Sequence, residues 1–311
     1  MLRAFFKLQE MNKIFHIIFS LCIANLAFNQ VYNKTDEKNY LDSTFTQTLE
    51  GEIVEKYPNG NVKSVRRYKN GKAHGEFLTF YPNGQLNSKS YYIEGKENGE
   101  CTLFFDNGKT LYEINIEDGV LNGPFALYYP NGTIYQKGSY KNDQYSGKWQ
   151  EYYDSGILKH LYKYNKGLLD SVCISYFENG NTESELSYKD GLLDGKSIHY
   201  YKNGNKKFDL NYKSGSYDGT IFFYYENGNL GEKVTYVDGK KDKYQIKYAI
   251  NGDLETVRKY KLNKRHGLSI YYFPFNGKIN CLEKYIDNKE VEPNFFDKLI
   301  FKNLINFNFK K

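Results

Sequence analysis

Hydrophobic and polar residues recur along this chain in the same order, with a period of 24 residues. Each copy holds two short segments of alternating apolar and polar residues, separated by Asn-Gly or a one-letter variant of it. A tenth copy, Asn276-Gly277, follows an insertion at Pro274 and Phe275. The fixed period predicts one array of about ten repeats over residues 51–290 rather than several globular domains. The glycines of the first nine copies are Gly60, Gly84, Gly108, Gly132, Gly156, Gly180, Gly204, Gly228 and Gly252.

Each repeat is predicted to be a β-hairpin, and successive hairpins are predicted to continue one antiparallel meander. Proline precedes the asparagine at Pro58, Pro82 and Pro130, and it suits the second position of a type I turn, where its fixed φ is favourable. We therefore expect a three-residue loop with the glycine as a G1 bulge, which pairs Phe80 with Leu86.

This register places most aromatic side chains on one face of the sheet and polar side chains such as Lys63, Lys159 and Glu183 on the other. A further aromatic column, beginning with Tyr57 and Tyr81, lies on that other face and is expected to cover the turn. The tyrosines assigned to the aromatic face are Tyr128, Tyr152, Tyr176, Tyr200 and Tyr224 from the first strands, and Tyr92, Tyr140, Tyr164, Tyr188, Tyr212 and Tyr236 from the second strands.

The predicted fold is an all-β, elongated antiparallel β-hairpin repeat. Its roughly twenty strands are expected to twist into a curved single-sheet ribbon or half-pipe with the aromatic face inside, because a flat sheet of that width is unfavourable. The aromatic face has two interpretations, the wall of a binding surface or a core that packs on itself. The two overlap if the middle of the face is packed while its mouth stays open.

The N-terminal residues are typical of a secretory signal. Lys13 precedes an apolar stretch from Ile14 to Ala27 that is short for a membrane span, and a polar segment follows it. We predict a signal peptide over residues 1–30, with Met11 as an alternative start, and a linker over residues 31–50. The chain is then exported to the periplasm, the cell envelope or the medium; the alternatives are an uncleaved anchor or, without a signal, a cytoplasmic protein.

The C-terminal residues 291–311 have apolar residues at near-helical spacing, from Phe295 to Ile305. A repeat array needs its last hydrophobic surface covered, so a short capping helix is the expected structure. The alternatives are a helix on a membrane surface, helped by Lys298 and Lys302, or a sorting signal.

Charge and cysteine usage remove several classes of function. The formal charge of +6 comes from 43 basic and 37 acidic residues that are mixed along the chain, so no basic stripe predicts nucleic acid as a partner. Cys101 and Cys173 hold the same repeat position three units apart, roughly 29 Å at the usual strand spacing, which is beyond disulfide reach. Both are expected to fill an apolar column, and Cys281 stands alone.

No pattern predicts a metal site or an active site. Asp-Gly pairs such as Asp194-Gly195 and Asp218-Gly219 stack along one edge, as a calcium site would require. Aspartate also suits left-handed turns, and His74 shares the same column, so we interpret these pairs as turns. The histidines lack metal-ligand spacing. We expect no metal, no cofactor and no enzymatic activity.

The repeated pattern resembles the bacterial variant of the MORN repeat, a type also found in YwqK-like antitoxin proteins. The shared motif is Gly-x-φ-x-x-aromatic-aromatic-x-Asn-Gly-x-φ, then Tyr-x-x-Gly-x-x-(Asp, Asn or His)-Gly, over about three quarters of the chain. Departures occur at Asp143, Ser155, Ser171, Lys243 and Ala249. The resemblance implies an elongated all-β scaffold for protein or lipid-surface contacts, without enzymatic activity.

Three functions follow as hypotheses. The first is an exported scaffold that binds an unknown protein through its aromatic wall, because tyrosine offers a large contact area with a polar tip. The second, implied by the antitoxin resemblance, is a cytoplasmic immunity protein that neutralises a toxin, and a secretory signal conflicts with it. The third is binding of a lipid surface by the array or the tail.

Overall fold

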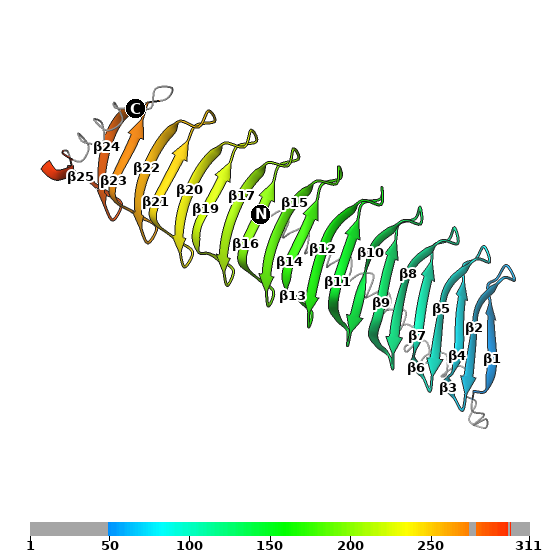
Figure 1. Ribbon diagram of the computed structural model, residues 1–311. Helices are drawn as coiled ribbons and strands as arrows, with labels where there is room; N and C mark the ends of the chain where they lie inside the picture. The colour runs from blue at the N-terminus through cyan, green and yellow to red at the C-terminus, as the bar shows by residue number, and fades with distance from the viewer. Residues whose placement is uncertain (1–48, 274–277, 298, 300–311) are drawn as a thin grey trace. The chain divides into compact units, whose positions relative to one another are not determined.

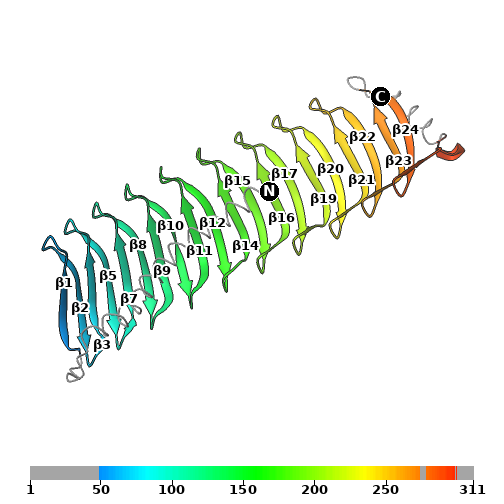
Figure 2. The same ribbon diagram turned by 180° about the vertical axis from the view of Figure 1, so that it is seen from behind.

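The computed structural model describes residues 49–273, 278–297 and 299, which form one antiparallel sheet of 25 strands and a short helical turn at residues 295–297 and 299. Hairpin follows hairpin along the sheet, and the strands are arched (Figures 1 and 2). The predicted hairpin repeat with a short C-terminal helix is confirmed. The predicted signal peptide and the Asn276-Gly277 turn lie outside the described residues.

The strands are β1 (Gly51–Lys56), β2 (Val62–Lys69), β3 (Lys72–Ala73), β4 (Gly75–Phe80), β5 (Leu86–Ile93), β6 (Lys96–Glu97), β7 (Gly99–Phe104), β8 (Thr110–Glu117), β9 (Val120–Tyr128), β10 (Ile134–Lys141), β11 (Gln144–Tyr152), β12 (Leu158–Asn165), β13 (Leu168–Leu169), β14 (Ser171–Tyr176), β15 (Thr182–Lys189), β16 (Leu192–Tyr200), β17 (Lys206–Lys213), β18 (Ser216–Tyr217), β19 (Gly219–Tyr224), β20 (Leu230–Val237), β21 (Lys240–Tyr248), β22 (Leu254–Lys261), β23 (Lys264–Tyr272), β24 (Ile279–Ile286) and β25 (Lys289–Val291).

The Asn-Gly turn has the geometry that the prolines predict. In the hairpin of β4 and β5, the N–H of Tyr81 donates to the carbonyl of Gln85 at 2.8 Å, and the N–H of Gly84 donates to the carbonyl of Tyr81 at 2.8 Å. Gly84 has a φ of 89°, the left-handed conformation of a G1 bulge, and Phe80 pairs with Leu86. The three-residue turn is therefore confirmed.

The assignment of the tyrosine columns of both strands to one face is wrong, because the second strand contains one more unpaired residue. Phe80 pairs with Leu86 but Thr79 pairs with Ser88, so Asn87 has no partner in the ladder. One extra residue exchanges the two faces for the rest of the strand. Tyr92 therefore lies on the face of Phe77, with the two ring centroids 4.4 Å apart, and the same shift recurs in the other hairpins.

We call the two faces of the sheet the packed face and the open face. The packed face carries the column of Phe77 together with the tyrosine column of Tyr92, and the open face carries the columns of Leu78 and Phe80. Among the described residues, every buried hydrophobic side chain except Ile270 lies on the packed face. The column of Phe77 continues as Cys101, Phe125, Trp149, Cys173, Ser197, Ile221, Gln245 and Ser269.

A two-residue turn joins each hairpin to the next. Both of its residues have positive φ, the type I′ geometry that suits right-twisted strands. Asp143, which stands where most copies have glycine, has a φ of 62°. Ser171 and Lys243, which replace a second glycine, have φ values of 72° and 66°. The departures from the repeat consensus thus keep the backbone conformation of the loops.

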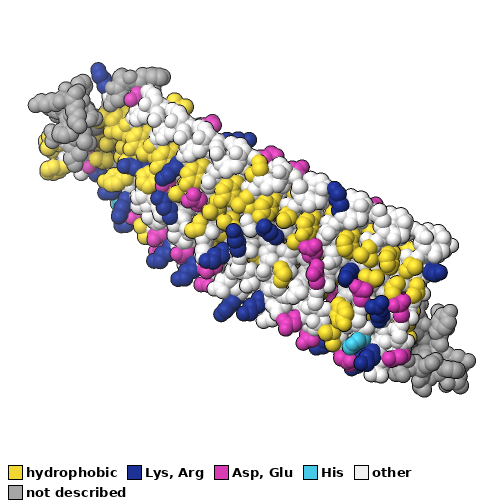
Figure 3. Space-filling model, turned by 45° about the vertical axis from the view of Figure 1, so that its right-hand side comes forward, with side chains coloured by type: hydrophobic (Ala, Val, Ile, Leu, Met, Phe, Trp, Pro, Cys, Tyr) yellow, Lys and Arg dark blue, Asp and Glu magenta, His cyan; other side chains and the backbone are white. Residues whose placement is uncertain are grey.

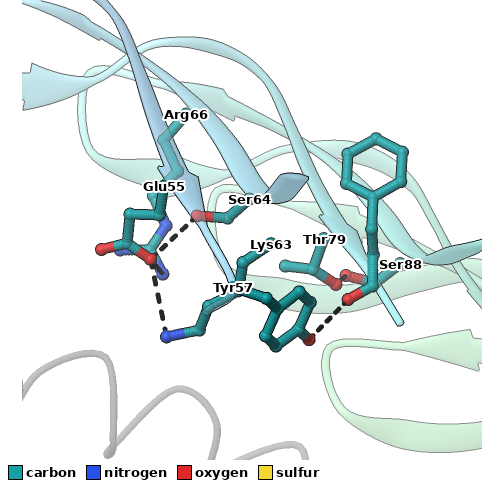
Figure 4. Close-up of polar contacts among 8 residues, drawn as sticks. Glu55, Tyr57, Lys63, Ser64, Arg66, Thr79 and Ser88 are labelled. Carbon is teal, nitrogen blue, oxygen red and sulfur yellow. Dashed lines mark hydrogen bonds and ion pairs between the residues drawn. The ribbon is translucent and has the colours of Figure 1, made fainter. Parts of the chain in front are cut away.

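The column that begins with Tyr57 links neighbouring hairpins. The Tyr57 hydroxyl donates to the backbone carbonyl of Phe80 at 2.8 Å, and Figure 4 shows this hydroxyl pointing to the next hairpin. The tyrosines at the same repeat position make the same bond, as Tyr153 does to Tyr176 at 2.9 Å. The Asn-Gly turns add a second link, because the side chain of Asn59 donates to the carbonyl of Pro82 at 3.0 Å. Hydrogen bonds thus fix the spacing of successive turns.

The short C-terminal helix is fastened to the last hairpin. Asn294 and Asp297 form a capping box, in which each side chain accepts the backbone N–H of the other residue at 2.9 Å. The Asp297 carboxylate also accepts a hydrogen bond from Lys284 of β24 at 2.6 Å, and these two contacts lower the pKa of Asp297. The helix therefore attaches to the C-terminal end of the sheet, as a cap requires.

Candidate functional site

Six of the eleven tyrosines that the sequence proposed for binding lie on the packed face and stabilise it. Tyr140 and Tyr212 are buried, and burial raises the pKa of both phenols. Tyr212 packs in a cluster around Ile221, which is 0 % exposed. The remaining four are half-buried in the same ladder, and they are Tyr92, Tyr164, Tyr188 and Tyr236.

Trp149 occupies the centre of this face and was not among the proposed site residues. Its indole N–H donates to the carbonyl of Ser139 at 3.0 Å, and its ring contacts Phe125 and Tyr145 at centroid distances of 5.4 and 4.6 Å. Gly138 makes room for it, because a Cβ on Gly138 would lie 2.2 Å from the Trp149 ring. The sequence signal for this contact was the single tryptophan together with Gly138, because most other repeats have a bulky residue at the position of Gly138.

The other five tyrosines lie together on the open face, beside the Asn-Gly turns. We call Tyr128, Tyr152, Tyr176, Tyr200 and Tyr224 the tyrosine band. All five are half-buried, so each ring presents an edge or face to solvent. Across each hairpin an aliphatic or polar residue pairs with the tyrosine, as Leu158 does with Tyr152 and Leu230 with Tyr224. The structure therefore separates the two tyrosine sets that the sequence had placed on one face.

Charged side chains flank the tyrosine band. Figure 3 shows a hydrophobic band along the sheet with basic and acidic side chains beside it. Lys137 lies over the ring of Tyr152 at 5.4 Å, and the Tyr128 hydroxyl donates to Glu113 at 2.9 Å. Burial, together with this hydrogen bond to the carboxylate, raises the pKa of Tyr128 to about 12. The band thus combines apolar rings with groups of both charges.

A row of polar side chains interrupts the packed face. It crosses the strands in the order Gln136, Glu151, His160, Ser175, Ser184 and His199, each residue paired with the next. Glu151 is 0 % exposed and accepts a hydrogen bond from Lys159 at 2.7 Å through one oxygen, while its other oxygen has no partner. Burial lowers the pKa of His160 and of His199.

The acid, histidine and serine of this row do not form a nucleophilic triad. Nδ1 of His160 lies 2.9 Å from the Ser175 hydroxyl, but Glu151 is hydrogen-bonded to Lys159 rather than to the histidine. A triad needs the acid to hold the other imidazole nitrogen. The row is therefore a hydrogen-bonded part of the packed face. The row can be recognised in the sequence only after the repeats are aligned according to the strand pairing of the structure.

The aspartates at the loop edge act as turn residues. Asp194 accepts the backbone N–H of Ser214 at 3.0 Å, and Asp218 accepts that of Asp238 at 3.4 Å, so each carboxylate bonds the next turn along the sheet. Within the described residues no group of three or more histidine, cysteine, aspartate or glutamate side chains is arranged to hold a metal ion. The same part of the chain contains no helix long and apolar enough to cross a membrane.

Two solved structures show a remote likeness to this chain. A structure of the Photorhabdus luminescens Tc holotoxin pore is 11 % identical over 77 % of this chain and 14 % of its own, with a TM-score of 0.18. A TcdB2–TccC3 structure is 9 % identical over 79 % and 17 %, with a TM-score of 0.16. This chain therefore spans less than a fifth of the length of either structure. Among curated proteins, no sequence matches the chain.

The family comparison is specific. Seven segments match the model of the MORN repeat variant, and strands β11 and β12, and β21 to β24, continue the same sheet outside them. The matched segments are residues 49–70, 73–94, 97–118, 121–142, 169–190, 193–214 and 217–238. The chain thus contains seven MORN repeat variants, a generally non-catalytic repeat type that suggests a scaffold for protein or membrane interaction.

Proposed function

We propose that this array is a non-enzymatic scaffold that binds a partner protein through its open face, with the tyrosine band as the contact surface. The observation that carries the proposal is the division of the tyrosines between the two faces. Those of the packed face are used to stabilise the sheet, whereas the tyrosine band remains half-exposed on the open face. Exposed aromatic rings with polar tips are favoured at protein interfaces.

The charges beside the band favour a protein over a lipid surface. Binding to anionic lipid needs basic residues gathered on one side of an apolar surface. Here Glu113 of β8 and Lys137 of β10 lie on the open face with only β9 between them, and Lys196 and Lys206 both pair with Asp209, at 3.4 and 3.0 Å. Such alternation suits a partner protein with complementary charges.

The proposal includes export, on the sequence evidence of the apolar stretch from Ile14 to Ala27. Mass spectrometry of the mature chain from the producing cells tests it, and a cleaved N-terminus near residues 27–30 in an envelope or secreted fraction is expected. A chain with Met1 or Met11 intact in the cytosol would contradict export and favour the antitoxin hypothesis.

A photo-crosslinking residue in place of Tyr176 tests the binding surface directly. We expect the full-length chain to give one reproducible protein adduct in its own cells, and the additional changes Tyr152→Ser and Tyr200→Ser to remove it. The matched control is Tyr91→Ser with Tyr244→Ser, since both tyrosines are exposed but lie outside the band.

An adduct that survives the two band changes while circular dichroism shows a folded sheet would contradict the proposal. Flotation of the purified chain with liposomes, combined with the absence of any protein adduct, would contradict it in favour of the lipid hypothesis.

A further inference from the structure

The open face has a hollow over the adjacent strands β7 to β11. The hollow has a volume of about 530 Å³ and its floor includes Pro124, Ala126 and Ser139. These side chains are small for their repeat positions. Three repeats further on, the position of Ala126 holds Ile198, and four repeats further on it holds Phe222. The hollow therefore results from missing side-chain volume in an otherwise regular sheet.

Opposite charges line the two sides of this hollow. Glu100 of β7 and Glu113 of β8 stand on one side, and Lys137 of β10 and Lys148 of β11 stand on the other. No ion pair joins the two sides in the described part of the chain. Glu113 and Lys137 lie two strand spacings, about 10 Å, apart, and Glu100 and Lys148 lie four strand spacings, about 19 Å, apart. Tyr128 and Ile134 form an apolar end beside the turns.

The carboxylates and ammonium groups retain hydrogen-bonding capacity for a ligand. Glu113 accepts one hydrogen bond from Tyr128, at 2.9 Å, and Glu100 accepts a long one from Thr102, at 3.4 Å. Lys137 lies over the ring of Tyr152, and Lys148 is exposed. A carboxylate has about four lone-pair sites and an ammonium three donors, so each side can bind an opposite charge.

We infer that this hollow anchors an extended peptide segment of the partner, with a basic residue at one end, an acidic residue at the other and apolar residues between them. This inference rests on the proposed function and specifies where the partner is held. A span of about 19 Å corresponds to roughly six extended residues at about 3.3 Å each. The basic residue binds at Glu100 and Glu113, the acidic residue binds at Lys137 and Lys148, and the apolar residues cover Ala126 and Pro124.

Three blocked hexapeptides labelled with a neutral dye test the inference by fluorescence anisotropy with the full chain. All share the centre Ala-Val-Tyr-Ala; one has lysine first and aspartate last, one has aspartate at both ends, and one has lysine at both ends. We expect the mixed peptide to bind at least about 10-fold more tightly than either like-charged peptide, a difference of about 1.4 kcal/mol. Equal binding of all three would overturn the inference.

Two variants of the chain make the test specific. Ala126→Phe fills the hollow with the residue that Phe222 shows to be tolerated at this repeat position, and it should weaken the mixed peptide at least about 10-fold. Ile198→Phe is the matched control at the same repeat position outside the hollow, and it should change nothing. Glu100→Lys with Glu113→Lys should make the peptide with two aspartates the tightest binder.

The outcomes separate the inference from the proposed function. If Tyr152→Ser and Tyr200→Ser remove the protein adduct but the hollow variants bind every peptide alike, the inference is overturned and the scaffold proposal stands. If the peptides behave as expected while the band changes leave the adduct intact, the tyrosine band is not the contact surface.

Discussion

The two faces of this sheet use the same residue type for different purposes. On the packed face, Tyr140 and Tyr212 are buried among other rings, and Trp149 is 1 % exposed. On the open face, Tyr152 and Tyr200 are half-buried, with charged residues as neighbours. A tyrosine column in a repeat protein therefore does not by itself mark a binding surface, since its role depends on the face it occupies.

The difference between the faces is created by one residue in each hairpin. The unpaired residue that follows Leu86, and its equivalents in the other repeats, exchanges the faces for the rest of the strand. Without it, both tyrosine columns would lie together and the column of Phe77 would face the lysines. The bulge thus gathers the bulky residues of both strands on one side.

The largest effect on the free energy of unfolding is expected from two consecutive residues whose side chains lie on opposite faces. Ile221 is fully buried on the packed face and Phe222 is half-buried on the open face. Ile221→Ala should reduce the free energy of unfolding by about 2–5 kcal/mol, because it leaves a cavity. Phe222→Ala should cost clearly less, although it removes more atoms. Urea unfolding of both variants measures the contrast, and a greater loss for Phe222→Ala would break the comparison.

Gly138→Ala tests how tightly the side chains of the packed face fit together. The new Cβ would overlap the Trp149 ring, so the change should cost about 1–3 kcal/mol of unfolding free energy, as overpacked cores do. Trp149→Phe in the same chain should recover part of this loss, since Phe125 holds the equivalent position one repeat earlier. A double variant no more stable than Gly138→Ala would show that the loss has another cause.

A smaller effect is expected from the links between turns. Tyr153→Phe removes the hydrogen bond to the carbonyl of Tyr176 and should cost about 0.5–1.5 kcal/mol. Phe105 and Phe177 occupy the same position naturally, so the fold should persist. Tyr152→Phe is the control on the open face and should be nearly neutral in thermal unfolding. Equal melting temperatures for the two variants would argue against the link.

The smallest effect concerns pH. Burial lowers the pKa of His160 and of His199 below the usual 6.5. At His160 the charge of Lys159 lowers the pKa further, whereas Glu151 raises it. At His199 the charge of Lys207 lowers the pKa further. The folded chain then binds fewer protons than the unfolded chain, so stability falls as the pH drops through 6.5 and levels off below the folded pKa. Replacing both histidines with glutamine should make urea unfolding less pH-dependent between pH 7 and 5. An unchanged slope would contradict the assignment.

Much of the fold follows from the sequence, and the face assignment shows where such reasoning ends. The period, the turn at Pro82 and the pairing of Phe80 with Leu86 depend on local backbone chemistry, which the residues display. The bulge after Leu86 does not, because Asn87 looks like any polar strand residue. The available signal was the apolar column of Phe77, Trp149 and their equivalents, which an uninterrupted strand would leave on the face of the lysines.

The hollow near Pro124 could not be predicted for a related reason. It depends on small residues at three separate repeat positions that become neighbours only in the observed register. A correct register would have allowed a search for it among the aligned repeats.

The most direct test of the division between faces is urea unfolding of Tyr212→Ser and Tyr200→Ser, two identical substitutions on opposite faces. Tyr212 packs against the Ile221 cluster, so its replacement should cost about 3 kcal/mol or more, whereas Tyr200→Ser should cost less than about 1 kcal/mol. Equal losses, or a larger loss for Tyr200→Ser, would contradict the account.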